Sequence, residues 1–588
     1  MTVLPAIHEG QFRLLKIIKA EPSLECEVRV WDLPSQNEGG ESRSPQASYF
    51  ALSYAWGAAT PTWSITLNGK PFEITENLGA ALVEIYRREE IRGAWQWIDQ
   101  ICIDQADDDE KSRQVNAMHI VYACARRTLI WLGPAADDSN LAMDNMRKLT
   151  EEMGKPPYPT SETEKEVIHR RLAPRNHPVW RAVVRLFGRS WFGRVWILQE
   201  VVLCKGAYVL CGDRTLVWEA LVEFANAIVA IWPAVLMNAG QDPTQETVSG
   251  FDSCSQIDRF RRDAAARRLF PLLTTTRNRD TSDVVDHLYG IAAMLPEIQK
   301  PFIRVDYSRS YIEAIIAFCK GCVDKDPALW VLSMAASTSR TQGLPSWCPD
   351  LAHRFSDGTQ LASYPAFQAG FINRSQRASP IRVLAQPPNS ISVPGFRLDA
   401  VSHVVHTAPN DGDMETWESE CKQLFESTRT HGGGNDDAER LETYARTLAA
   451  GHWNPTVPIV PEHRLYNDLQ GARRFWQEVV SKTPSDFSTY HVSKDAVLRF
   501  NVAVHLHDQR KFFSTQNGRI GLGPSQLRPN DIVCVFYSGA CLWVLRESET
   551  GGTFTLVGEA YMHGFMDLPT TLKAHAAERG ADAEFVIV

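Results

Sequence analysis

The segment Ser48–Gly57, SYFALSYAWG, is apolar almost throughout and ends at a glycine, a pattern typical of a buried β-strand. Trp95–Ile103 (WQWIDQICI) and Thr128–Gly133 (TLIWLG) predict two further strands. Between the three lie two segments with helical spacing of apolar residues, one that Asn77 can cap and one that opens at Asp107. Apolar strands separated by amphipathic helices indicate a mostly parallel sheet covered on both faces. Ligands of such sheets bind beyond the carboxyl ends of the strands.

The overall composition is that of a globular protein. The chain has 588 residues, of which 44% are hydrophobic and 22% charged, which excludes wholesale disorder and fibrous repeats. The net charge of −9 argues against a whole-chain electrostatic grip on nucleic acid. Seventeen tryptophans outnumber both tyrosine and methionine, and nine of them lie in the first 200 residues. Because an indole N–H needs a partner, this surplus predicts a specialised core or pocket there.

Cysteine use and the N-terminus indicate a reduced, cytoplasmic setting. The N-terminus lacks a basic segment followed by an apolar one, so no secretory signal is expected. The longest apolar stretch, Phe224–Met237, is interrupted and too short to span a membrane. Twelve cysteines are too dilute for a disulfide framework. Cys319 and Cys322 form a CxxC on an expected helix, where packed thiols are favoured over metal or redox use.

Polar, Gly/Pro-rich stretches divide the chain into four expected parts. Residues 1–47 form an N-terminal strand and linker, 48–215 the α/β domain, 216–385 a mainly helical region, and 386–588 an α+β region with a partly antiparallel sheet. Strands of this last region are expected at Ser390–Gly395, Ile532–Tyr537, Leu542–Arg546 and Phe554–Val557, and a helix at Arg440–Ala450.

Common catalytic motifs are absent: there is no Walker A sequence, HExxH or GxSxG. Gly518–Pro524 (GRIGLGP) lacks dinucleotide-fingerprint spacing and is expected to be a turn. His505-x-His507 has no third ligand nearby, so a structural role is favoured over a metal site. The acidic run Asp107–Glu110 suits a solvated helix N-terminus better than a metal. No metal site is therefore predicted.

Two arginine-rich stretches, Lys165–Arg194 and Arg259–Arg279, leave nucleic-acid binding open as a weaker hypothesis. Arginine outnumbers lysine 45 to 16, which favours fixed ion pairs and anion contacts over a loose polycationic surface. The favoured prediction is that nucleic acid is not a partner.

Four blocks of sequence together resemble the heterokaryon-incompatibility domain of filamentous fungi. They are ALSYAWG (Ala51–Gly57), WIDQICIDQ (Trp97–Gln105), RQVNAMHIVYACARRTLIWLG (Arg113–Gly133) and RVWILQEVV (Arg194–Val202). Their order, their spacing and several rare residues match, and the strong part runs from Ser48 to Cys204. The family usually has Asn where this chain has Asp104, and often a polar residue where it has Ala58. Both departures lie at expected strand ends and bear on pocket chemistry.

The resemblance implies a self/non-self recognition protein whose activation triggers programmed cell death. It also implies a distant similarity to Toll/interleukin-1 receptor (TIR) domains, which are flavodoxin-like α/β units that signal by assembly and in some branches cleave NAD. Two readings stay open: an NAD glycohydrolase that takes NAD as substrate without a resident cofactor, and a non-enzymatic signalling and oligomerisation module. The implied partners are a second copy or another incompatibility or NLR-like protein.

In the NAD-cleaving branches one glutamate is essential and lies on a short helix after a tryptophan. The matching stretch here, Arg194–Val201 (RVWILQEV), puts Glu200 in that role. A carboxylate near the ribose can stabilise an oxocarbenium-like transition state. Glu200 can equally project to solvent beside buried neighbours, and both readings are retained.

The remaining candidates are substrate-binding residues: Ser53, Tyr54, Trp56, Asp99, Arg194 and Trp196. Trp56 and Trp196 are candidates for stacking on nicotinamide or adenine, and Arg194 for a phosphate contact. Trp56 could instead be a core residue, and Arg194 could pair with an acidic side chain nearby. Asp99 is expected in mid-strand, where a buried carboxylate serves either a structural hydrogen-bond hub or a site.

Overall fold

The computed structural model describes most of the chain and divides it into two compact units, Met1–Ser310 and Tyr311–Val588. The residues described are 3–36, 42–43, 48–57, 60–154, 172, 177–231, 245–323, 329–335, 340–353, 369, 381–406, 414–428, 443–444, 447–448, 510–537, 539–549, 551–566 and 582–588. The boundary between the units falls inside the expected helical region, 216–385, and the strands Gln11–Lys19 and Glu25–Asp32, within residues 1–47, join the sheet of the expected α/β domain.

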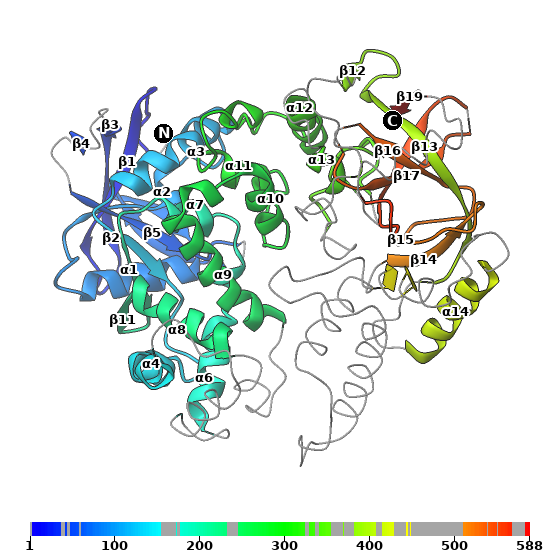
Figure 1. Ribbon diagram of the computed structural model, residues 1–588. Helices are drawn as coiled ribbons and strands as arrows, with labels where there is room; N and C mark the ends of the chain where they lie inside the picture. Colours follow the sequence, from blue (N-terminus) through cyan, green and yellow to red (C-terminus); the bar gives the residue numbers. More distant parts are fainter. Residues whose placement is uncertain are drawn as a thin grey trace. The chain divides into compact units, whose positions relative to one another are not determined.

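The first unit is built on one nine-stranded sheet (Figure 1). Its strands, in spatial order, are β11 (Arg214–Val217), β10 (Ala207–Cys211), β9 (Thr128–Trp131), β5 (Tyr49–Tyr54), β8 (Trp95–Trp97), β1 (Gln11–Lys19), β2 (Glu25–Asp32), β6 (Trp63–Leu67) and β7 (Lys70–Ile74). The consecutive strands β10, β9, β5 and β8 run parallel, whereas β11, β1 and β7 each pair antiparallel with a neighbour. The α/β class is confirmed, but the sheet is mixed rather than mostly parallel.

Helices cover both faces of the parallel strands, as the apolar strands predict. Leu52 and Tyr54 belong to a core with α1 (Glu76–Arg87) on one face. On the other face, the Tyr49 hydroxyl donates to the carbonyl of Val121 in α3 (Asp108–Cys124), and Ser53 contacts α7 (Ile197–Val202). The two faces alternate along β5 because successive side chains of a strand point in opposite directions.

Two local predictions in this unit are wrong. The expected strand Trp95–Ile103 stops at Trp97, and Asp99–Cys102 form a helical turn, α2, in which the Asp99 carboxylate accepts from the Gln100 N–H. This side chain-to-backbone bond competes with strand pairing. Helix α1 is capped by Thr75, whose hydroxyl accepts from Leu78, and not by Asn77, which lies one position inside the helix.

Asp107 caps α3 as predicted, accepting from the Glu110 N–H at 3.0 Å. The Glu110 carboxylate does not return to the cap. It pairs instead with Arg13 of β1, at 2.5 and 2.9 Å, and accepts from the Asp104 N–H at 2.7 Å. Because Arg13 and Glu110 are both buried, this ion pair fixes β1 against the first turn of α3, and the bond from Asp104 ties in the loop that follows α2.

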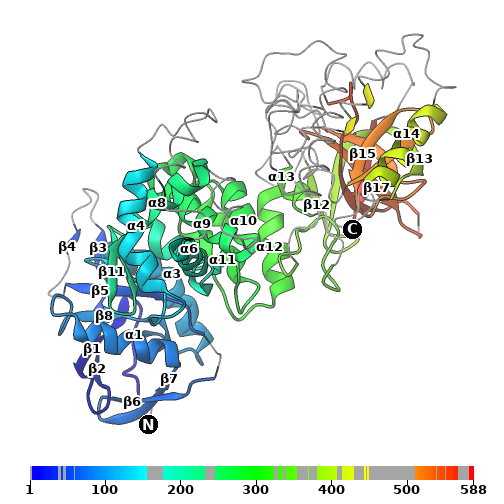
Figure 2. The same ribbon diagram turned by 90° about the horizontal axis from the view of Figure 1, so that it is seen from below.

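The helical prediction after residue 217 is confirmed within the first unit. The helices described after that residue are α8 (Trp218–Ile231), α9 (Gln245–Arg262), α10 (Leu269–Arg277) and α11 (Asp286–Ala292), with short 3₁₀ turns at Ala264–Ala266 and Lys300–Phe302. Before it lie α4 (Ser139–Met153), α6 (Pro178–Phe187) and a 3₁₀ turn at Ser190–Gly193. Helices α4, α6, α8 and α9 pack side by side (Figure 2).

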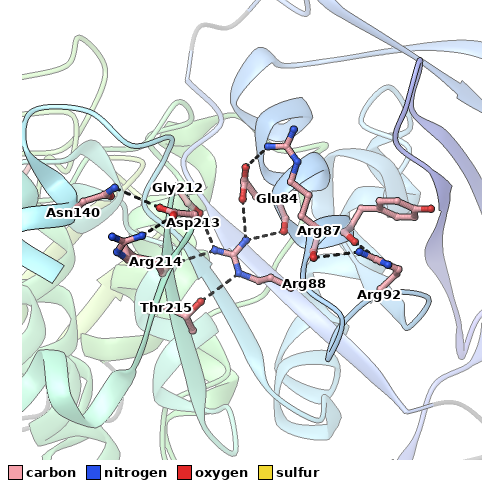
Figure 3. A network of polar contacts seen from close by, with 10 residues as sticks. Glu84, Arg87, Arg88, Arg92, Asn140, Gly212, Asp213, Arg214 and Thr215 are labelled. Atoms are coloured by element: carbon pink, nitrogen blue, oxygen red, sulfur yellow. Dashed lines mark hydrogen bonds and ion pairs between the residues drawn. The ribbon is translucent and has the colours of Figure 1, made fainter. Parts of the chain in front are cut away.

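A polar network ties the end of α1 to the β10–β11 hairpin (Figure 3). Arg88, the C-cap residue of α1, donates to the carbonyl of Gly212 at 2.8 Å and to the Thr215 hydroxyl at 3.3 Å. In the same hairpin Arg214 pairs with Asp144 of α4 at 2.7 Å. The network joins the end of α1 to the antiparallel hairpin at the edge of the sheet.

The second unit is a β structure with few helices. It contains α12 (Tyr311–Val323), α13 (Trp330–Ser333), β12 (Arg382–Leu384), β13 (Ser390–Val404), α14 (Met414–Ser427), β14 (Arg510–Thr515), β15 (Ile520–Pro524), β16 (Ile532–Phe536), β17 (Leu542–Glu547), β18 (Phe554–Ala560) and β19 (Asp582–Ile587). Strand β13 pairs with β16, the pairing continues through β17 and β18 to β19, and β19 returns to β13. These pairings close a barrel that is antiparallel except between β18 and β19.

The four strands predicted for this region are all present, each within a residue or longer than expected. The turn predicted at Gly518–Pro524 is wrong beyond its first residues: Gly518 has a φ of +74°, and a strand begins at Ile520. His505-x-His507 and most of Arg440–Ala450 lie outside the described residues.

Cys319 and Cys322 are buried on α12, which confirms them as packed thiols. None of the twelve cysteines, all of which lie in the described residues, forms a disulfide. Among the helices that the structure describes, none has the length and apolar character needed to cross a membrane. A short pair of two-residue strands, β3 (Ser35–Gln36) and β4 (Ser42–Arg43), completes the secondary structure.

Candidate functional site

Polar side chains gather where β5 and β8 end. Ser53 and Tyr54 are the last two residues of β5 and are both buried. The chain then turns through Trp56 to Gly57, whose φ of +79° favours glycine. Next to β5, strand β8 leads into Asp99 at the start of α2. The parallel pairing therefore places these residues at one edge of the sheet, where ligands of α/β folds bind.

Glu200 reaches the same edge from α7. Its side chain is buried, with only 2% of the residue exposed, so the alternative that it projects to solvent is wrong. Oε2 accepts a hydrogen bond from the Ser53 hydroxyl, and the Trp191 indole N–H donates to Ser53 Oγ at 2.9 Å. Residues 147 positions apart in the chain thus share one hydrogen bond.

Burial raises the pKa of Glu200 from 4.5 to about 7, because a desolvated carboxylate resists ionisation. The positive charge of Arg194 and the hydrogen bond from Ser53 oppose this rise, and the charge of Asp99 adds to it. A carboxyl group with a pKa near neutrality, beside other charged groups at a strand edge, is typical of functional sites.

Asp99 is half-buried, and each oxygen of its carboxylate accepts a hydrogen bond. Oδ2 accepts from the Trp56 indole at 2.8 Å, and Oδ1 accepts from the Gln100 N–H at 2.7 Å. Burial raises its pKa, while Arg194 and these hydrogen bonds act in the opposite direction. Trp56 is itself half-buried, so its ring is held by Asp99 at the partly open side of the cluster.

Arg194 precedes α7 and is half-buried. Its guanidinium donates to the Tyr54 carbonyl, and its charge lowers the pKa of both Glu200 and Asp99. In the described part of the chain Arg194 forms no ion pair with either carboxylate. The alternative that Arg194 pairs directly with an acidic neighbour is therefore not observed there. A guanidinium with donors to spare between two carboxylates can hold an anionic ligand group.

Trp196 does not join this cluster. Its indole donates to Asp286 of α11 at 3.1 Å, and the same carboxylate accepts from the hydroxyls of Tyr307 at 2.7 Å and Thr281 at 3.1 Å. Asp286 is a second buried carboxylate whose pKa burial raises. The structure brings together the other six predicted residues, and Trp196 serves a neighbouring network.

Sequence reasoning missed three residues that hold the strand ends. Trp191 donates to Ser53; the Asn77 amide donates to the Ala55 carbonyl at 2.6 Å; and the Trp131 indole donates to Asn77 at 2.9 Å. The tryptophan surplus was the available signal, because Trp131 lies at the end of β9 beside Gly133, whose φ is +111°. Nothing in the local pattern pairs Trp191 with β5.

Two arginines of the second basic stretch bind backbone carbonyls of the segment around α7. Arg261 donates to the carbonyls of Val201 and Cys204, which follow Glu200, and Arg279 donates to that of Phe192 at 3.0 Å. These guanidinium groups act as internal anchors. Of the first stretch, residues 165–171 and 173–176 lie outside the described residues; in the described part, Arg189 donates to the carbonyls of Leu132 and Pro134. Within the described residues no cluster of three or more metal-ligating side chains is present.

Comparison with known proteins agrees with the sequence resemblance. Residues 49–200 match the family model described as heterokaryon incompatibility protein (HET), and residues 482–580 match the Het-6 beta-barrel domain. The chain is 24% identical to heterokaryon incompatibility protein 6, OR allele, of Neurospora crassa, over 89% of this chain and 90% of that protein. No solved structure matches the chain.

Proposed function

Since this chain carries a heterokaryon-incompatibility domain at residues 49–200, we propose that it is a self/non-self recognition effector that triggers programmed cell death by cleaving NAD. The observation that carries the proposal is the cluster at the strand ends, in which Glu200 has a pKa of about 7 and lies with Ser53, Asp99 and Arg194. The proposed setting is the cytoplasm, and the proposed partner is a second copy or another incompatibility protein.

Cleavage of NAD does not require a general acid to protonate the leaving group. The nicotinamide ring of NAD is cationic, so the bond between C1 of the ribose and the ring nitrogen breaks with its electron pair moving onto nicotinamide. The ribose becomes oxocarbenium-like, water adds at C1, and one proton is released. Ionised Glu200 supports this step by stabilising the developing positive charge.

The other residues bind and orient. Arg194, half-buried and hydrogen-bonded to the Tyr54 carbonyl, has donors for the pyrophosphate. Trp56 lies at the partly open side and offers an aromatic face to a cationic ring, with its orientation set by Asp99. Asp99 itself has carboxylate oxygens for ribose hydroxyls. Tyr54 and Ser53 form the floor of the cluster.

The test uses chromatography to measure the nicotinamide and ADP-ribose that the purified chain releases from NAD. Glu200→Gln is expected to abolish release, and Glu219→Gln, which changes an exposed glutamate on α8, is expected to leave it unchanged. Because Glu200 must be ionised, activity is expected to rise with pH and to level off above about 7. Equal turnover by wild type and Glu200→Gln would refute the assignment.

A second candidate function, a non-enzymatic TIR-like signalling module, is favoured by the burial of Glu200. A carboxylate that is 2% exposed and bound to Ser53 serves packing as well as chemistry. This candidate predicts that NAD stays intact at high protein concentration while oligomers form. Sedimentation velocity of the same preparation measures the oligomers.

A further inference from the structure

The two oxygens of Glu200 have different environments. Oε2 accepts from the Ser53 hydroxyl, whereas no hydrogen bond to Oε1 occurs within the described part of the chain. Glu200 is surrounded by charged or titratable groups from several elements: Arg194 before α7, Asp99 of α2, Tyr54 of β5 and Tyr122 of α3. Of these only Arg194 favours the ionised carboxylate by its charge.

The donor and acceptor chemistry of Trp191 gives the hydrogen bonds a direction. An indole N–H can only donate, so at 2.9 Å Trp191 occupies a lone pair of Ser53 Oγ. The single hydroxyl hydrogen of Ser53 is then left for Oε2 of Glu200. If Glu200 takes up a proton while this chain of bonds persists, Oε1 is the favoured site, because protonation would weaken Oε2 as acceptor of the Ser53 hydrogen bond.

Trp191 is held firmly enough for this role. It lies in the 3₁₀ turn Ser190–Gly193, is fully buried, and packs edge-on against Phe192 at 5.1 Å and Trp218 at 6.2 Å between ring centroids. The ring cannot swing away from Ser53 without opening this aromatic cluster.

We propose that Trp191 and Ser53 form a directed hydrogen-bond relay that anchors Oε2 of Glu200 and leaves Oε1 as the oxygen that meets the substrate. Trp191 is in this view a positioning residue that acts through Ser53, and the proposal rests on the proposed function of the Glu200 site. A hydrogen bond donated to a carboxylate stabilises the ionised form, so the relay offsets part of the effect of burial.

The test compares Trp191→Phe with Trp218→Phe. Both changes keep an aromatic ring and remove an indole N–H, but the Trp218 N–H is buried and has no hydrogen-bond partner among the described residues, so its removal breaks no relay. Trp191→Phe and Ser53→Ala are expected to raise the apparent pKa of Glu200 by about one to two units, which is 10- to 100-fold in the ratio of ionised to protonated carboxyl at a given pH. Trp218→Phe is expected to leave it unchanged.

Two measurements separate this proposal from the proposed function. The pH profile of nicotinamide release is expected to shift to higher pH in Trp191→Phe and to recover at high pH, whereas a purely structural role lowers activity by one factor at every pH. Infrared difference spectra, wild type minus Glu200→Gln, follow ionisation of the carboxyl group without any substrate. Should wild type release no nicotinamide, the infrared titration still tests the relay.

Ser53→Thr retains a hydroxyl on a strand residue and is expected to restore the wild-type pKa, which guards against misfolding of Ser53→Ala as the cause. An unchanged infrared titration in Trp191→Phe would overturn the relay. An equal shift in Trp218→Phe would overturn it as well, because that change affects packing alone.

Discussion

Replacing Glu200 by glutamine is expected to stabilise the folded protein, and to do so only above acidic pH. The pKa of Glu200 is about 7 in the folded chain and ordinarily 4.5, so the folded state binds this proton more tightly. Between these two values stability therefore falls as pH rises, and above 7 the loss is complete. Glutamine has nearly the same shape as glutamate but carries no charge, so the variant does not lose stability as Glu200 ionises.

The magnitude follows from the pKa difference. The full shift corresponds to about 3 kcal/mol, and the part that develops between pH 5 and pH 8 to roughly 2–3 kcal/mol. Because Glu200 is only 2% exposed, solvent screening does not reduce this figure. At pH 5 the free energy of unfolding of Glu200→Gln is expected to exceed that of wild type by about 1 kcal/mol or less.

Urea unfolding at pH 5 and pH 8, followed by tryptophan fluorescence, measures the effect. Fluorescence suits the first unit because its parallel-strand edge is rich in tryptophan. Glu219→Gln, on an exposed position, controls for loss of a negative charge and is expected to track wild type at both pH values. Identical pH dependence in wild type and Glu200→Gln would refute the claim that burial, rather than contact with Ser53 and Arg194, dominates at this carboxyl.

Two further predictions concern stability. Glu110→Ala leaves the Arg13 guanidinium buried without its carboxylate and is expected to lower the free energy of unfolding in urea by about 3–5 kcal/mol. Arg13→Met combined with Glu110→Leu is expected to lower it less. A larger loss in the double variant would contradict this. Gly79→Ala puts a methyl group 2.5 Å from the Trp63 ring and is expected to cost about 1–3 kcal/mol despite better helix propensity. Trp63→Leu in the same chain is expected to recover part of that loss, and no recovery would point to a cause other than the close contact.

Much of the fold could be predicted from local pattern. The apolar runs ending at Tyr54 and Trp131 form parallel neighbours in the sheet, and the four strands predicted for the second unit begin at their expected residues. The failures have local causes as well. Asp99 makes a side chain-to-backbone hydrogen bond that ends β8 early, and Thr75 caps α1 in place of Asn77, whose amide is bound to Ala55.

Six of the seven candidate site residues lie in one cluster, because the matching blocks contain the strand ends and the short helix that reach it. Trp196 was predicted to join them as an aromatic residue of the same matching block, able to stack on nicotinamide or adenine. Its indole instead points to Asp286, 90 positions away. Adjacency in sequence does not determine the direction of a side chain on a short helix packed between other helices.

Apolar periodicity, a local property, was sufficient to predict an α/β domain, and the resemblance to a known family singled out Glu200, Arg194 and the aromatic residues as a candidate site. Three features depended on tertiary structure: the antiparallel strands beside β8, the closed barrel, and the hydrogen bonds from Trp191 through Ser53 to Glu200. Trp191 lies 138 positions from Ser53. The pKa and hydrogen-bond direction of Glu200 arise from burial and from partners that folding brings together, and neither property belongs to any single stretch of the chain.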